Sequence, residues 1–130
     1  MTKRVMLFFI IISVFSILVA CSKTAYTITV YQMESFAAAN PDSIQVITDP
    51  DIIRSFTDAF RKAVKQPGIV NIVDPQYKVE LDTEVYFLWV SENHGTIMNV
   101  KDTHTIYTIP EKNASEVYKA IDHLYTKGDH

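Results

Sequence analysis

The sequence predicts an α+β fold: an antiparallel sheet with two amphipathic helices packed on one face, in the order β-β-α-β-β-β-β-α, preceded by a signal peptide. Three observations lead to this prediction. The 130-residue chain opens on an apolar run that ends at its only cysteine. Two later stretches repeat apolar residues at the 3.6-residue spacing of a helix, and the short stretches around them have the alternation and β-branched composition of strands.

The N-terminal segment has the layout of a secretory signal peptide. Lys3 and Arg4 give it a positively charged start, and residues 5–19 form an apolar stretch interrupted only by two serines. This stretch is shorter than the about 20 apolar residues that a membrane-spanning helix needs. We therefore expect it to be removed after export.

The segment ends in Leu18-Val19-Ala20-Cys21, which matches a bacterial lipobox. In that motif the cysteine thiol receives a diacylglycerol before the signal peptidase cuts in front of it. The alternative is an uncleaved anchor in which Cys21 is a chance residue, and both interpretations attach the protein to the membrane. We expect lipid attachment at Cys21 and a location at the extracytoplasmic face of the cell membrane.

The predicted organisation is a lipoprotein signal peptide at residues 1–20, a short lipid-anchored tether at 21–25 and a single α+β domain at 26–130. The length after residue 20 suits one domain with one core. Residues 1–20 hold two of the 12 Lys and Arg residues and none of the 15 Asp and Glu residues, so the mature chain is acidic and nucleic acid is not an expected partner. With Cys21 lipidated, no thiol remains for a disulfide or a thiolate metal site.

The first half of the domain is predicted to contain two strands and a helix. Residues 26–31 alternate threonine with β-branched and aromatic residues, and residues 44–48 form a second short strand. Between them, the three alanines at 37–39 are interpreted as a helical turn that leads into a loop. Asp49 and Pro50 are expected to be the N-cap and first residue of the helix.

That helix is amphipathic, with charged residues on its outer face. Pro67 and Gly68 are predicted to end it. The positions predicted to face the core are Ile52, Ile53, Phe56, Ala59, Phe60, Ala63 and Val64.

The second half is predicted to form an antiparallel meander followed by a helix. The run at 85–90 is apolar in both alternating sets, which indicates either a central strand covered on both faces or an aromatic strip shown to a partner. Asn113, with Glu116 three residues later, is interpreted as a capping box for the last helix. The four meander strands are expected at 77–81, 85–90, 96–100 and 104–109, and the buried stripe of the helix comprises Val117, Tyr118, Ile121, Leu124 and Tyr125.

The meander contains three distinctive stretches: Tyr86-Phe-Leu-Trp89, Gly95-Thr-Ile-Met98 and Asp102-Thr-His-Thr-Ile-Tyr-Thr108. They resemble the YhfM-like group of small lipoproteins from Bacillus-type bacteria. The resemblance extends over most of the mature chain and is most specific at residues 77–109. It implies a Gram-positive surface location and one compact domain, and it carries over no catalytic residue.

Catalytic motifs are missing from the sequence, which has no G-x-S-x-G, no H-E-x-x-H and no phosphate-binding loop. We therefore expect no enzyme activity, no cofactor and no metal centre. His94 and His104 are expected at opposite ends of one strand, about 17 Å apart at ~3.4 Å per residue, which is too far to share an ion.

One edge of the predicted sheet gathers Asp82, Glu84, Asp102 and His104, because the turns at 82–83 and 101–103 lie on the same edge. The functional interpretation is a weak site for a cation or polar ligand. The favoured interpretation is that the carboxylates cap backbone N–H groups in turns beside Lys101.

Phe87 and Trp89 are the second candidate, either as an exposed recognition strip or, as we favour, as core residues. The preferred functional hypothesis is a non-enzymatic, membrane-tethered domain that binds another component of the cell envelope. The alternative is a lipoprotein that binds a small ligand or cation, in a pocket between sheet and helices or at the Asp82, Asp102 and His104 edge. A hydrolase with a concealed site is the third hypothesis.

Overall fold

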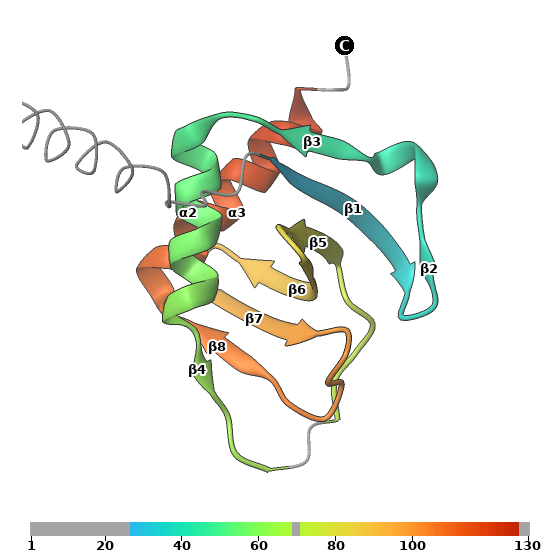
Figure 1. The fold of residues 1–130 in the computed structure, drawn as a ribbon, viewed down its shortest axis with the longest axis vertical. Helices are drawn as coiled ribbons and strands as arrows, with labels where there is room; N and C mark the ends of the chain where they lie inside the picture. The colour runs from blue at the N-terminus through green and yellow to red at the C-terminus, as the bar shows by residue number, and fades with distance from the viewer. Residues whose placement is uncertain (1–26, 69–70, 128–130) are drawn as a thin grey trace, which may run out of the picture.

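The computed structural model describes residues 27–68 and 71–127 (Figure 1). It confirms the predicted class, because an antiparallel sheet carries two helices on one face. The predicted signal peptide and tether, residues 1–25, lie outside the described residues. Over the described ranges, no helix combines the length and apolar character needed to cross a membrane.

The order of the main strands and helices is the predicted one, with two additional strands of two residues each. The elements are β1 (Ile28–Ser35), β2 (Ala38–Ala39), the 3-10 helix η2 (Pro41–Ser43), β3 (Gln45–Ile47), α2 (Pro50–Lys62), β4 (Val64–Lys65), β5 (Tyr77–Leu81), β6 (Glu84–Ser91), β7 (His94–Asn99), β8 (Tyr107–Ile109) and α3 (Glu111–Thr126). Neighbouring strands in the sheet follow the order β2-β1-β5-β6-β7-β8-β4, and β3 pairs with β1 beside β2.

The β1–β2 hairpin corrects the prediction for the alanines. Strand β1 continues to Ser35, and the chain then turns back so that Ala39 pairs with Met33. The predicted helical turn at 37–39 was therefore wrong. Three alanines are too few to offset the cost of nucleating a helix, whereas the edge of β1 offers backbone partners at once.

Helix α2 begins as predicted, but it ends earlier. The side chain of Asp49 accepts a hydrogen bond from the Asp51 N–H, and Pro50 takes the first position. After Lys62 the chain is extended, and Val64, predicted to face the core, is 61% exposed. Val64 and Lys65 pair with β8 as strand β4, because the free edge of β8 satisfies their backbone groups.

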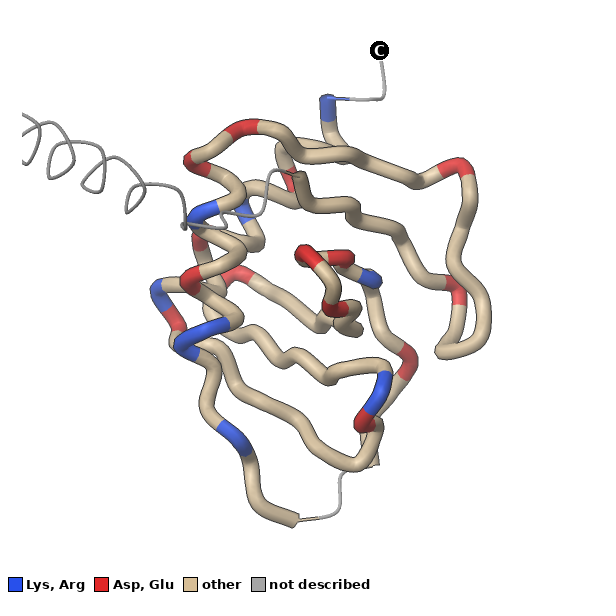
Figure 2. The backbone as a smooth tube through the Cα atoms, viewed as in Figure 1, with Lys and Arg blue, Asp and Glu red and all other residues tan. Residues whose placement is uncertain are grey.

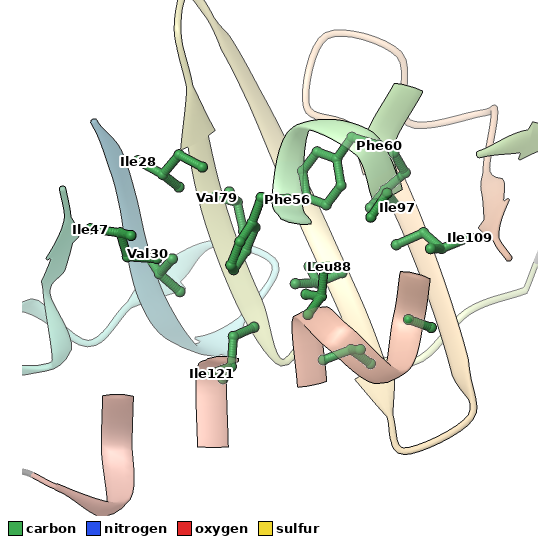
Figure 3. Packing of buried hydrophobic residues seen from close by; sticks show 14 of the residues in the cluster. Ile28, Val30, Ile47, Phe56, Phe60, Val79, Leu88, Ile97, Ile109 and Ile121 are labelled. Carbon is green, nitrogen blue, oxygen red and sulfur yellow. The ribbon is translucent and has the colours of Figure 1, made fainter. Parts of the chain in front are cut away.

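The core lies between the two helices and one face of the sheet. Figure 3 shows side chains from strands and helices pointing into a single layer. The ring of Phe60 packs edge-on against Tyr86 on β6, with centroids 5.1 Å apart. Side chains that are fully buried in this layer include Phe56, Ile28, Leu88, Ile109, Ile121, Val30, Val79 and Val117.

Helix α3 starts at Glu111, before the predicted cap. Pro110 occupies the N-cap position and makes no side-chain capping bond, so the capping role predicted for Asn113 was wrong. Asn113 is buried in the first turn, beside Ala114, which is fully buried. The helix begins early because its first turn already packs on the sheet. The predicted apolar stripe is confirmed, since its five residues are buried or packed against the core.

Candidate functional site

The sheet face opposite the helices carries a second, smaller apolar cluster. Successive residues of β6 point to opposite faces, so Leu88 and Val90 join the core while Phe87 and Trp89 point away from the helices. Phe87 is 8% exposed and its cross-strand neighbour Met98 is 3% exposed. Strand β6 is therefore covered on both faces at Phe87, and Trp89 is half-buried.

Two segments of the same chain cover this cluster. From the β1–β2 hairpin, the ring of Phe36 meets Phe87 edge-on with centroids 5.6 Å apart, and it lies 6.0 Å from Trp89. From the segment before β5, the carbonyl oxygens of Val73 and Asp74 accept hydrogen bonds from the indole Nε1–H of Trp89 at 3.0 and 3.1 Å. These bonds hold the indole ring in place.

Hydrogen bonds also tie the segment before β5 to the hairpin. The Phe36 N–H donates to Asp74 Oδ1 at 3.3 Å, and the Met33 N–H donates to the Gln76 carbonyl at 2.9 Å. The side chain of Gln76 accepts from the N–H of Val90 at 2.6 Å. Three stretches that are distant in sequence are thus held together around Trp89.

The outer side of this assembly is apolar and solvent-exposed. Phe36 is 38% exposed, Val73 is 76% exposed, and Trp89, which contacts the Phe36 ring and the Val73 carbonyl, is half-buried. We call Phe36, Val73 and Trp89 the aromatic surface. Of these three residues, the sequence pattern singled out Trp89 alone. Phe36 and Val73 are brought to Trp89 by a hairpin and a loop, and neither segment has a periodic pattern that predicts this contact.

The aromatic surface lies far from the point where the chain enters the domain. Phe36 follows the last residue of β1, and β1 begins at Ile28. At about 3.3 Å per residue, the eight residues of β1 separate the two points by about 26 Å along the strand.

The charges of the molecule are distributed unevenly between its two sides. Figure 2 shows both signs of charge on the helices, whereas the charged residues along the sheet and its loops are mostly Asp and Glu. In the described ranges, the basic residues of the sheet and its loops are Lys65, Lys78 and Lys101. One of the acidic residues, Asp74, is exposed and adjoins the aromatic surface, because its carboxylate accepts a hydrogen bond from the N–H of Phe36. The acidic residues of the sheet side are Glu34, Asp42, Asp74, Glu80, Asp82, Glu84, Glu92 and Asp102.

The residues of the predicted polar cluster lie in the β5–β6 turn, at the start of β6 and in the segment between β7 and β8. Asp82 occupies the β5–β6 turn with a left-handed φ of 57°, and Glu84 accepts a hydrogen bond from Asn99 Nδ2 at 2.8 Å. Asp102 Oδ1 accepts from the His104 N–H at 3.3 Å, as expected for a turn-capping carboxylate. Within residues 27–68 and 71–127, no three His, Cys, Asp or Glu side chains form a group able to hold a metal ion.

Polar side chains line two adjoining depressions near the C-terminal end of α3. The depressions have volumes of about 300 and 360 Å³ and share Gln32 and Asn40. The hydroxyl of Tyr125 donates to the carbonyls of Ser43 at 2.9 Å and Val30 at 3.4 Å. Burial, followed by the neighbouring Tyr77, raises the pKa of Tyr125 to about 12, so this hydroxyl stays protonated at neutral pH.

Comparison with known proteins adds one finding. The model of a family described as YhfM protein matches residues 22–125, which is most of the chain. No curated protein and no solved structure matches the sequence or the fold.

Proposed function

The chain belongs to the YhfM family, and on that premise we propose that it is a lipoprotein held at the extracytoplasmic face of the cell membrane through Cys21. Its domain binds another protein of the cell envelope and catalyses no reaction. The lipobox at residues 18–21 supports the anchoring. The aromatic surface supports the binding role.

The observation that carries the binding role is the exposure of Phe36 and Val73, both of which belong to segments that contact the half-buried Trp89. Aromatic side chains dominate the energetics of protein interfaces, and tryptophan is enriched among the residues that matter most. Hydrogen bonds hold the backbone of this surface in position, so little conformational entropy is lost when a partner binds.

The charges around this surface indicate the chemistry of the partner. Asp74 is exposed next to Phe36, whose backbone N–H donates a hydrogen bond to its carboxylate, and it lies on the acidic side of the molecule. A partner segment that carries lysine or arginine next to an apolar side chain matches both features, because carboxylates attract the cation and aromatic rings favour it through cation–π contact. We therefore expect a basic, partly apolar segment of an envelope protein.

The anchoring is tested by the mass of the mature protein purified from a host that lipidates exported proteins. The expected mass is that of the chain from Cys21 onward plus a diacylglycerol. Cys21→Ser is expected to leave unprocessed precursor or to release the protein from the membrane fraction. A mature chain without the lipid mass would contradict the anchoring.

The binding role is tested by photocrosslinking in the cell, with a photoreactive residue in place of Val73. The control places the same residue at Lys119, which is exposed on α3 on the helix side. We expect a discrete crosslinked envelope protein from Val73 and not from Lys119. The captured protein, once purified, should bind the anchored chain less tightly after Phe36→Ser and at high salt. Identical adducts at both positions, or binding unaffected by Phe36→Ser, would contradict the proposal.

The alternative function, binding of a small polar ligand, draws on the depressions beside Tyr125. Gln32 and Asn40 line both of them, and amide side chains suit a neutral ligand with hydroxyl or amide groups. An oligomer of N-acetylglucosamine is a suitable probe of that chemistry. Saturable heat of binding that disappears in Gln32→Ala would favour this function.

A further inference from the structure

A second exposed apolar surface lies on the edge strand next to the entry of the chain into the domain. We infer that Ile44 and Val46 rest against the headgroup region of the lipid bilayer and so orient the domain on the membrane. This inference rests on the proposed lipid attachment at Cys21. It assigns a membrane contact to side chains of the folded domain, in addition to the lipid.

The register of the sheet places this surface beside the entry point. Strand β3 pairs with the first half of β1, so that Ile47 lies opposite Ile28 and Val46 lies opposite Thr29 (Figure 1). In sequence, only residues 22–26 separate Cys21 from the first described residue. Even fully extended, this stretch spans about 20 Å at ~3.5 Å per residue. Val46 is therefore held within a short distance of the bilayer.

Both side chains are among the exposed large hydrophobic residues of the described chain. Ile44 is 46% exposed and Val46 is 58% exposed. Ile47, the next residue, is buried against the core, so the two exposed residues are not part of the helix-side packing. In the described chain β3 pairs with β1 only, so these side chains lie at an open edge of the sheet.

The flanking charges limit the depth of the contact. Asp42 precedes the surface and Asp49 follows it, and both are exposed. Carboxylates are costly to bury in hydrocarbon, so the two aliphatic side chains can reach the headgroup region while the ends of the strand stay in water.

Because the lipid anchor already holds the protein at the membrane, a weak contact of Ile44 and Val46 with the bilayer is sufficient to orient the domain. Tethering converts docking into an intramolecular event, with an effective concentration in the millimolar range for a short linker. Two aliphatic side chains would not hold a free protein on a bilayer, but they can bias the orientation of an anchored one.

The test uses the mature lipidated protein in vesicles of phosphatidylethanolamine and phosphatidylglycerol. Because Cys21 is the only cysteine and its thiol is occupied by lipid, Val46→Cys introduces a single reactive thiol. A polarity-sensitive fluorophore at that position is challenged with lipids that carry a quencher near the headgroup. The matched control is Val64→Cys, since Val64 is 61% exposed on β4, the edge strand at the other end of the sheet.

We expect several-fold greater quenching at position 46 than at position 64, and a reduction toward the control level when Ile44→Asp is added. Flotation of the vesicles is measured on the same samples. Protein that fails to float contradicts the lipid anchor itself. Protein that floats but is quenched equally at both positions overturns the membrane contact and leaves the anchor intact.

Discussion

Gly95 of β7 and Ala114 of α3 are in such close contact that a side chain at position 95 would require its neighbours to move by a few tenths of an ångström. A methyl group built on the Cα of Gly95 would lie 3.1 Å from the Cβ of Ala114, and also 3.1 Å from Cδ1 of Ile109. Carbon atoms pack best at about 3.5–4.0 Å. The first turn of α3 therefore approaches the sheet closely because residue 95 has no Cβ.

Gly95→Ala is expected to destabilise the protein by about 1–3 kcal/mol, the usual cost of overpacking a well-packed site. The free energy of unfolding in urea checks this. Adding Ala114→Gly should recover part of the loss, because it removes one of the two clashing methyl groups. The matched control is Gly68→Ala, where φ is 98° and no atom lies within 4 Å of the new Cβ. Its cost comes from backbone strain, so Ala114→Gly should not reduce it.

Tyr125→Phe is expected to lower the free energy of unfolding by about 0.5–1.5 kcal/mol, the net value of a typical intramolecular hydrogen bond. The variant removes the bond that joins α3 to the Ser43 carbonyl, 82 residues earlier in the chain. The apolar ring and its stacking on Tyr77 are retained. Urea unfolding of Tyr125→Phe and of a Tyr118→Phe control gives the measurement. Equal effects of both substitutions would argue against the role of this hydroxyl.

Stability is expected to fall at alkaline pH, and Tyr125 is expected to contribute to the fall. Its pKa is about 12 in the folded protein, raised mainly by burial, whereas an unfolded tyrosine has a pKa of about 10. The unfolded chain loses this proton first, so the contribution is fully present below about pH 10 and is lost as the pH rises toward 12. Urea midpoints at increasing pH should decline less steeply in Tyr125→Phe than in the natural protein.

Phe36→Ala is expected to expose the indole of Trp89. The phenyl ring of Phe36 lies 6.0 Å from Trp89, the only tryptophan in the chain. Its removal should shift the intrinsic fluorescence to longer wavelength and raise the quenching constant for acrylamide. Val64→Ala, on β4, serves as the control and should leave the emission unchanged. Emission unaffected by Phe36→Ala would mean that Phe36 does not cover the indole.

Divalent cations are expected to bind no more tightly to the natural protein than to a His104→Ala, Asp102→Ala double variant. Asp102 is already the acceptor for the N–H of His104, and Glu84 is the acceptor for Asn99. Calorimetric titration with calcium and with zinc checks this. Binding to the natural protein that disappears in the double variant would establish the cation site that the sequence raised as an alternative.

Much of the fold followed from local patterns. The Asp49 and Pro50 pair predicted the start of α2, because an N-cap oxygen and a residue without an N–H are useful at a helix start whatever surrounds them. The alternation of residues 77–81 predicted β5 with its observed bounds. Such signals are carried by neighbouring residues, so they can be read from the chain alone.

The candidate site was less predictable. Trp89 was identified because β6 is apolar on both faces, yet the sequence left open whether a partner or the chain itself covers it. The answer depends on Phe36, 53 positions earlier, and on the backbone carbonyl of Val73. No short-range pattern encodes a contact between residues this far apart.

By itself, the sequence determined the main strands and the two amphipathic helices, because periodicity and capping are properties of adjacent residues. The family resemblance likewise rests on short stretches of the chain. Only the tertiary structure decided that Val64 leaves α2 to pair with β8, that Ala38 and Ala39 return along β1, and that α3 begins before Asn113. In each case the deciding energy comes from a free strand edge or a packed face supplied by a distant part of the chain. Local preferences are too weak to oppose it.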